Sequence, residues 1–252
     1  MTIKKCCAVI GAASLLAAPN LFASMSITMM DNTGQYSAGD GGEFRAVTTG
    51  VPVDWNAYSS ATSGTVTSGT DGGSWGYNSG LDGQQYFQTF CTELNEEFSP
   101  GGLYTVTSIG DAAMTDNTGQ PVPITMGVAY LYSQFATGTL DGYDYTYGNQ
   151  RSTTSDLQNA IWILLGEENG TIASWIQTDL STGLGDASTS WTAAADGAFG
   201  VQDMVLGQPG QAQDQLVITA PVPEPSTIFA GALLLLPFGI GAIRSLRKER
   251  AV

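Results

Sequence analysis

Short runs in which apolar and polar residues alternate recur along most of the chain, and such alternation is typical of strands. Turn-forming residues separate the runs, and the stretch from Ser59 to Gly83 is especially rich in Gly, Ser and Thr. The alternation predicts five strands, at residues 26–30, 43–48, 86–94, 104–109 and 216–219. Most of the chain is therefore expected to be β-rich.

Two segments follow helical spacing instead. In residues 124–135 the apolar positions recur every three or four residues, and Gly138 supplies a signal for the end of a helix. Residues 155–168 repeat the pattern, with Ser155 as the predicted N-cap and Gly166 at the end. Because both helices lie between predicted strands, the expected fold class is α+β, a β-rich sandwich or barrel with a helical insertion.

The two ends of the chain carry apolar runs of another kind. Lys4 and Lys5 precede an apolar stretch and a small-residue cleavage site, so residues 1–23 are predicted to be a secretory signal peptide. Residues 228–243 form an apolar run that would be about 24 Å long as a helix, against about 30 Å for a bilayer core. The side chains of Arg244 and Arg247 can extend it by reaching the headgroups. The basic residues that follow the run are the predicted stop-transfer cluster, Arg244, Arg247, Lys248 and Arg250. We therefore expect an exported body at 24–220 and a tail at 221–252 with a single C-terminal transmembrane helix.

The tail has three parts in a fixed order, namely Pro223-Glu224-Pro225, the apolar run and the basic end. From Val222 to Arg250 it resembles the PEP-CTERM sorting signal of Gram-negative bacteria that make exopolysaccharide. The resemblance implies processing near Pro223-Glu224-Pro225 by an exosortase, a membrane-embedded cysteine transpeptidase. It also implies anchorage in the inner membrane before processing, followed by release to the cell surface or to the exopolysaccharide matrix of a biofilm. A plain C-terminal membrane anchor behind a Pro-rich linker is the alternative.

The charge of the body narrows its function. Of the 23 acidic residues only Glu224 and Glu249 lie in the tail, and of the eight basic residues only Arg45 and Arg151 lie in the body, which gives the body a formal net charge of −19. Such a surface repels nucleic acid and anionic lipid, so neither is an expected partner of the body. The chain has no His and the body has no Lys, which excludes imidazole chemistry and an internal Lys–Asn crosslink.

Cys91 is the one thiol of the predicted body, because Cys6 and Cys7 belong to the predicted signal peptide. An unpaired Cys in an exported protein pairs between chains, stays buried and inert, or takes part in chemistry. Cys91 lies in Phe90-Cys91-Thr92-Glu93-Leu94 on a predicted strand. The later segment Leu157-Gln158-Asn159-Ala160-Ile161-Trp162 opens a predicted helix, with Gln158 in its first turn.

Together these two motifs resemble the surface thioester domains of bacterial adhesins, known as TQXA domains. The resemblance covers residues 86–168, and Leu157 stands where that family usually has Thr. It implies an internal thioester between Cys91 and Gln158, with Phe90, Ala160 and Trp162 as its surroundings. An amine on a surface protein or on a host or matrix ligand would then open the bond and become covalently attached.

Such a bond requires the fold to press sulfur and carboxamide together, since well-oriented intramolecular reactions gain effective molarities of about 10⁵ to 10⁸ M. It also requires a dry site, because water would hydrolyse the thioester. The competing interpretation is a passive structural or polysaccharide-associated surface protein in which Cys91 is an inert, buried residue. Glu93, Glu96 and Glu97 have no placed partner carboxylate for glycoside hydrolysis, and no enzyme is predicted.

Two further patterns leave the prediction unchanged. Tyr143, Tyr145 and Tyr147 alternate, and they either stack on sugar rings of a polysaccharide or form a hairpin edge or a core-facing trio. Asp141 and Asp144 lack the loop pattern of an EF-hand calcium site. The sequence therefore predicts neither a metal nor a cofactor.

Overall fold

The computed structural model of the protein describes residues 25–31, 37–38, 41–71, 74, 76–114, 121–146, 151–186, 188–207 and 212–220. The predicted signal peptide at 1–23 and the predicted tail at 221–252 lie outside the described residues. The tail contains the sorting motif, the apolar run and the basic end, which are Pro223, Glu224, Pro225, residues 228–243, Arg244, Arg247, Lys248 and Arg250. In the part of the chain that is described, no helix combines the length and the apolar character needed to cross a bilayer.

Seven strands form one antiparallel sheet in the spatial order β11-β10-β7-β1-β4-β6-β5. Their bounds are β1 (Ser26–Asp31), β4 (Phe44–Thr49), β5 (Ser63–Thr65), β6 (Gln85–Thr89), β7 (Leu103–Gly110), β10 (Val201–Leu206) and β11 (Gln215–Ile218). Two short pairs stand apart from this sheet: β2 (Ser37–Ala38) with β3 (Gly41–Gly42), and β8 (Ala112–Met114) with β9 (Pro121–Pro123). All five predicted strands are present. The one at 86–94 is shorter than predicted, because β6 ends at Thr89 and Cys91 follows it.

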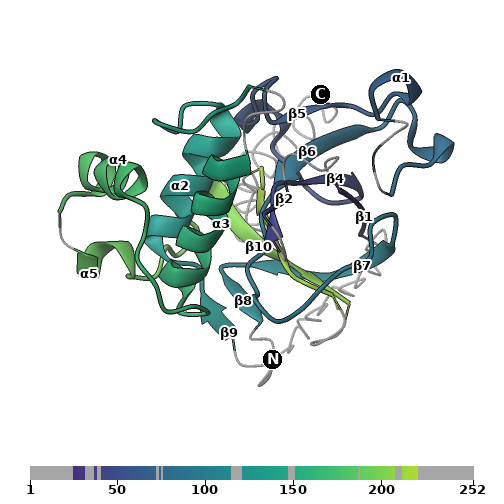
Figure 1. The fold of residues 1–252 in the computed structure, drawn as a ribbon. Coiled ribbons are helices and arrows are strands. Elements are labelled where there is room, and N and C mark those ends of the chain that lie inside the picture. The colour runs from purple at the N-terminus through teal and green to yellow at the C-terminus, as the bar shows by residue number, and fades with distance from the viewer. Residues whose placement is uncertain are drawn as a thin grey trace, which may run out of the picture.

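The helices lie beside the sheet in space (Figure 1), although along the chain they fall between its strands. Figure 1 shows α2 to α5 gathered on one side of the molecule and the short α1 on the opposite side. The helices α2 to α5 all fall between β9 and β10 along the chain, so the α+β class with a helical insertion is confirmed. The bounds of the helices are α1 (Ser68–Asp71), α2 (Met126–Thr137), α3 (Arg151–Leu165), α4 (Ser174–Leu184) and α5 (Ser188–Trp191), with 3-10 turns η1 (Trp55–Ala57), η2 (Ser79–Leu81) and η3 (Ala198–Gly200).

The ends of the two predicted helices follow from local chemistry. The Thr125 hydroxyl caps α2 by accepting a hydrogen bond from the Val128 amide, and Gly138 ends the helix in the left-handed conformation at φ 75°. Gly166, at φ 82°, follows the last turn of α3, as predicted. The predicted start of α3 is wrong, because the helix begins at Arg151 and Ser155 lies inside it. Its first turn is polar, so the apolar pattern revealed only the later turns.

Helices α2 and α3 cover the sheet with a layer of large side chains. Tyr132 and Phe135 of α2 and Leu157 and Ile161 of α3 are fully buried. The Tyr132 hydroxyl lies 3.0 Å from the carbonyl oxygen of Gln88 and 3.1 Å from that of Leu216, at the end of β6 and on β11. One side chain of the helical layer therefore touches both strands.

Two of the three alternating tyrosines belong to this core. The ring centroid of Phe135 lies 5.1 Å from that of Tyr143 and 6.0 Å from that of Tyr145. Their rings thus pack inside the molecule, which confirms the core-facing interpretation for these two residues. Tyr147 lies outside the described residues.

The chain that follows β6 pairs with β11, although these strands stand sixth and first in the sheet order. The Leu216 amide donates to the Phe90 carbonyl oxygen and the Thr92 amide donates to the Asp214 carbonyl oxygen, each at 3.1 Å, and Cys91 and Gln215 face each other in an isolated antiparallel bridge. These bonds join the two sides of the curved sheet. We call the paired segments, residues 90–93 and 213–216, the seam.

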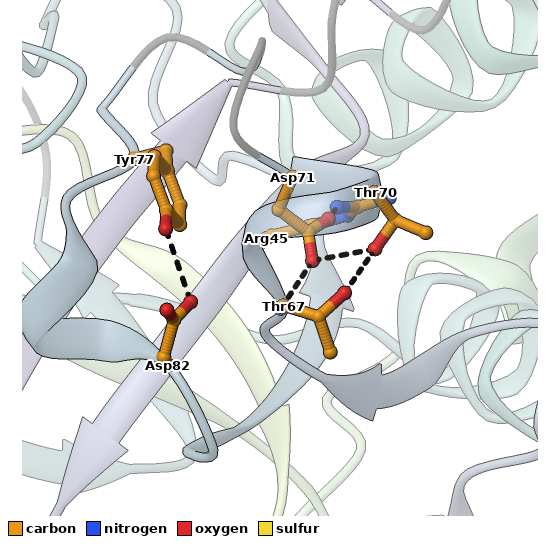
Figure 2. Close-up of polar contacts among 6 residues, drawn as sticks. All are labelled: Arg45, Thr67, Thr70, Asp71, Tyr77 and Asp82. Atoms are coloured by element: carbon orange, nitrogen blue, oxygen red, sulfur yellow. Dashed lines mark hydrogen bonds and ion pairs between the residues drawn. The ribbon is translucent and has the colours of Figure 1, made fainter.

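A separate polar cluster around the buried Asp71 lies on the far side of the sheet, between β4 and α1. Arg45 of β4 forms an ion pair with Asp71, and the guanidinium lies 4.7 Å from the centroid of the Tyr86 ring. Figure 2 shows the second carboxylate oxygen of Asp71 accepting from the Thr67 amide and the Thr70 hydroxyl, at 2.8 and 3.0 Å. These residues, Arg45, Thr67, Thr70 and Asp71, form the arginine cluster, which fastens α1 to the sheet.

Candidate functional site

The candidate site is the seam around Cys91, which is 0% exposed. Gln158, also fully buried, reaches it from the second turn of α3. Its Nε2 donates to the Cys91 carbonyl oxygen at 2.8 Å, and its Oε1 accepts from the Cys91 amide at 3.1 Å. The structure therefore brings together the two residues that the sequence singled out, through the side chain of Gln158 and the main chain of Cys91.

A second strand locks Gln158 in this position. The Gly42 amide of β3 donates to the same Oε1 at 3.1 Å, so the side-chain amide makes three hydrogen bonds to main-chain groups. Neighbouring Gly41 packs so closely on α3 that a Cβ there would lie 2.5 Å from Trp162 Cη2 and 2.8 Å from Gln158 Cγ. The carboxamide of Gln158 thus bridges β3 and the end of β6, as the backbone of an intervening strand would.

The sulfur of Cys91 contacts two other carboxamides. Its thiol donates to Gln213 Oε1 at 2.7 Å, and Gln215 Nε2 donates to Sγ at 3.3 Å. Gln213 and Gln215 are 1% and 0% exposed, and because they are two residues apart on an extended segment their side chains share a face. The Oε1 of Gln215 is buried without a hydrogen-bond partner, and its Nε2 lies 3.2 Å from the Gln213 carbonyl oxygen.

Glu93 holds this glutamine segment against Cys91. Its carbonyl oxygen accepts from Gln213 Nε2 at 2.6 Å, and its side-chain Oε2 accepts from the Asp214 amide at 2.8 Å. Asp214 Oδ1 in turn accepts from the Leu206 amide of β10 at 2.8 Å. The position of the two glutamines is therefore fixed by polar groups on both sides of the seam.

The electrostatics of the seam keep Cys91 in its thiol form. Burial is the main cause that raises the pKa of Cys91, and the negative charges of Glu93 and Asp214 raise it further, while the hydrogen bond from Gln215 acts in the opposite direction. Any reaction of the sulfur must therefore rely on close placement rather than on a standing thiolate population.

A carboxyl pair lies behind the seam. Asp203 of β10 is fully buried, and its pKa is raised well above the usual value by burial and by the neighbouring charge of Asp214. Its Oδ1 accepts from the Thr92 hydroxyl at 2.9 Å, and its Oδ2 is buried without a hydrogen-bond partner. Burial and the nearby charge of Asp214 both oppose ionisation of Asp203.

The surroundings that the resemblance implied are buried in the structure. Phe90 packs edge-on against Phe135 with ring centroids 4.9 Å apart, Ala160 is fully buried and Trp162 is 4% exposed. Phe90 thus turns into the apolar layer below the helices, whereas Cys91 turns into the polar seam. This alternation follows from the two faces of an extended chain.

Glu43 adds another buried carboxyl next to the Gly42 contact. It is 1% exposed, and burial raises its pKa to about 7 against the lowering effects of its Tyr143 hydrogen bond and of Arg45. The Tyr143 hydroxyl donates to Glu43 Oε2 at 2.6 Å and lies 2.8 Å from the Thr154 hydroxyl of α3. Glu43 is therefore expected to change its protonation state close to neutral pH.

Sequence reasoning missed Gln213, Gln215, Asp203 and Asp214. The predicted last strand began at Leu216, and a polar run such as Gln213-Asp214-Gln215 carries no signal of burial. Within the described residues, no group of three or more His, Cys, Asp or Glu side chains is arranged to hold a metal ion. Comparison of the chain with protein-family models, with curated proteins and with solved structures finds no match.

Proposed function

We propose that the protein is an exported surface or matrix protein whose Cys91 condenses with a neighbouring carboxamide into an internal thioester, ready for covalent attachment to an amine-bearing partner. The observation that carries the proposal is the contact between the Cys91 sulfur and the Gln215 carboxamide, 3.3 Å from Sγ to Nε2, inside a fully buried seam. Because the seam pairs the chain after β6 with β11, it also favours a barrel over a sandwich as the form of the sheet.

The geometry favours Gln215 over Gln158 as the source of the acyl group. Gln158 directs its amide to the main chain of Cys91, whereas Gln215 lies across the bridge from Cys91 and directs its amide to the sulfur. The unpartnered Oε1 of Gln215 carries no hydrogen bond that the condensation would have to break. Gln158 is the residue that holds the Cys91 backbone in place.

The chemistry that this arrangement supports is a balanced condensation. The sulfur attacks the side-chain carbonyl carbon of Gln215, a bond forms between sulfur and carbon, and the bond from that carbon to nitrogen breaks. The thiol proton leaves with the nitrogen as ammonia. Burial excludes the water that would hydrolyse the product, and the body contains no lysine that would quench it from within.

The proposal for the rest of the chain rests on the sequence. An exosortase processes the protein at Pro223-Glu224-Pro225 after the C-terminal helix has anchored it in the inner membrane, and the body then reaches the cell surface or the matrix. The order of motif, apolar run and basic end supports this route. An amine-bearing surface protein or a host or matrix ligand is the covalent partner, and the exopolysaccharide is the surrounding medium.

Intact-mass spectrometry of the purified full-length chain tests the thioester. We expect the mass to be lower by one ammonia than the sequence requires, and the thiol to resist alkylation after rapid unfolding. Methylamine should add its own mass and release one alkylatable thiol. Cys91→Ser is the matched control, which should keep the full mass.

A full mass together with a readily alkylated Cys91 would leave the passive structural or polysaccharide-associated protein with an inert buried Cys91. The sorting proposal has its own test, the deletion of Pro223-Glu224-Pro225. This deletion should retain the protein in the membrane fraction, whereas unchanged release would contradict exosortase processing.

A further inference from the structure

Gln213 is the third glutamine beside Cys91, after Gln158 and Gln215. The condensation between Cys91 and Gln215 does not by itself explain the hydrogen bonds that Gln213 makes. Gln213 is 1% exposed and lies two residues before Gln215, on the face that meets Cys91. A buried carboxamide costs free energy unless its polar atoms are hydrogen-bonded, and here each has a specific partner. Those partners are the reacting groups and the residue that anchors the segment.

Gln213 contacts both reactants of the proposed bond. Its side-chain Oε1 accepts the Cys91 thiol hydrogen at 2.7 Å, and its main-chain oxygen accepts from Gln215 Nε2, the group that would leave, at 3.2 Å. Because the thiol hydrogen points at Gln213, the sulfur presents a lone pair to the carboxamide of Gln215, whose Nε2 donates to it.

Gln213 is itself fixed from the other side. Its Nε2 donates to the Glu93 carbonyl oxygen at 2.6 Å, which also settles which end of the Gln213 amide faces the sulfur. The neighbouring Asp214 amide donates to Glu93 Oε2 at 2.8 Å. A residue held at both ends in this way is preorganised, and placement errors of about 1 Å can cost roughly 100-fold in rate.

We infer that Gln213 is the positioning residue for thioester formation, holding the thiol with its side chain and the leaving amide with its main chain. This inference rests on the proposed thioester and assigns a role within it. The reaction stays as written above: sulfur joins the Gln215 carbonyl carbon, and the thiol proton departs with ammonia. Gln213 is neither consumed nor charged in that step.

The test measures the rate of bond formation during refolding. The full-length chain is unfolded in urea and refolded in detergent, and the loss of one ammonia is followed by intact mass over time. Gln213→Leu removes the acceptor for the thiol and should slow formation about 100-fold. Gln88→Leu is the matched control, because Gln88 is a buried glutamine of β6, 5% exposed, with no contact to the sulfur among its described bonds, and it should leave the rate unchanged.

Rescue by a conservative variant separates positioning from a structural effect. Gln213→Glu keeps an acceptor for the thiol, and while its carboxyl is protonated it also keeps a donor for the Glu93 carbonyl oxygen. Formation in Gln213→Glu should recover at low pH and should change as the introduced carboxyl ionises and loses that donor, whereas the wild-type rate should lack that step. A merely structural role would not create a new pH dependence.

Each outcome decides one question. A wild-type chain that never loses ammonia contradicts the proposed thioester itself. A wild-type chain that forms the bond while Gln213→Leu forms it at the same rate overturns the role of Gln213 and leaves the thioester standing. If Gln213→Leu fails to refold, Gln213→Glu decides the question. A Gln213→Glu chain that forms the thioester at the wild-type rate, with no dependence on pH, would equally overturn the inference.

Discussion

The seam and the arginine cluster both contain buried polar groups, but they are built from different chemistry. In the arginine cluster a cation meets an anion, and Asp71 takes two further hydrogen bonds from its own turn, although Arg45 Nε has no partner. The seam, with Gln158 and Asp203 that reach it from α3 and β10, gathers a thiol, three carboxamides and several carboxyls, and Gln215 Oε1 and Asp203 Oδ2 have no hydrogen-bond partner there.

The difference indicates different purposes. Neutralised, well-bonded charge in the arginine cluster is explained by the need to fasten α1 to the sheet. The seam lowers the stability of the fold instead, because its buried oxygens without hydrogen-bond partners cost free energy and its carboxyls with raised pKa values are difficult to ionise. Where local rules are broken in this way, chemistry is a better explanation than stability.

The largest expected effect is the complete loss of the bond in Gln215→Leu. The Gln213 carboxamide still touches the sulfur, but through the oxygen that accepts the thiol hydrogen, so it is not expected to replace Gln215 and the chain should keep its full mass. Gln158→Leu retains the reacting pair and should only slow formation, about 100-fold, because the backbone of Cys91 loses its support. Intact mass measured during refolding distinguishes the two variants. If Gln158→Leu never formed the thioester while Gln215→Leu formed it normally, Gln158 would be the source of the acyl group.

The arginine cluster should respond through stability alone. Asp71→Ala leaves the buried Arg45 charge unpaired, which is expected to cost about 3–5 kcal/mol in the free energy of unfolding. Urea denaturation of a Cys91→Ser background measures this without the crosslink. The double variant Arg45→Met, Asp71→Leu should recover most of the lost free energy of unfolding. If Asp71→Ala were as stable as its parent, the ion pair would not contribute to stability.

Glu43 predicts a pH dependence of smaller size. Its folded pKa of about 7 exceeds the ordinary value of 4.5, so the folded state binds more protons between those values. Its contribution is thus fully present below pH 4.5 and is lost as the pH rises toward 7, by about 3 kcal/mol. Tyr143, Thr154 and Arg45 face this carboxyl, and none of them reverses the sign.

Urea midpoints between pH 4.5 and 8 measure this effect. Glu43→Gln keeps an acceptor for the Tyr143 hydroxyl but has no titrating group, so its stability should vary less with pH than that of the parent chain. Asp203 adds a change of the same sign, because its pKa is raised as well. Identical pH profiles for the parent and Glu43→Gln would contradict the assignment.

The smallest expected effects come from two glycines, one in each region. Gly41→Ala brings a methyl group within 2.5 Å of Trp162 and 2.8 Å of Gln158, and overpacking of this kind costs about 1–3 kcal/mol. Gly69→Ala in α1 meets nothing within 4 Å and replaces a poor helix former, so stability should rise by up to about 1 kcal/mol. Thermal denaturation compares them, and Gly41→Ala should also slow ammonia loss whereas Gly69→Ala should not.

Local patterns were sufficient for much of the fold but not for β10. The strands β1, β4 and β7 alternate plainly in sequence, and α2 has both its periodicity and its terminal Gly138. The strand β10 is buried along almost its whole length, and it carries Asp203 among apolar residues. Because neither of its faces is exposed, its sequence does not alternate between apolar and polar residues. The start of α3 was missed for the related reason that its first turn is polar.

The sequence by itself determined five of the strands, α2 and most of α3, the strongly acidic body with its lone thiol, and the placement of Cys91 and Gln158 in motifs that the structure brings into contact. Only the tertiary structure decided which carboxamide meets the sulfur. Gln213 and Gln215 lie more than 120 residues from Cys91 along the chain, and main-chain hydrogen bonds across the seam bring them together. A local pattern shows which residues of one segment share a face, but it does not show which distant segment pairs with it, so the bridge that sets Gln215 opposite Cys91 could not be found from the sequence.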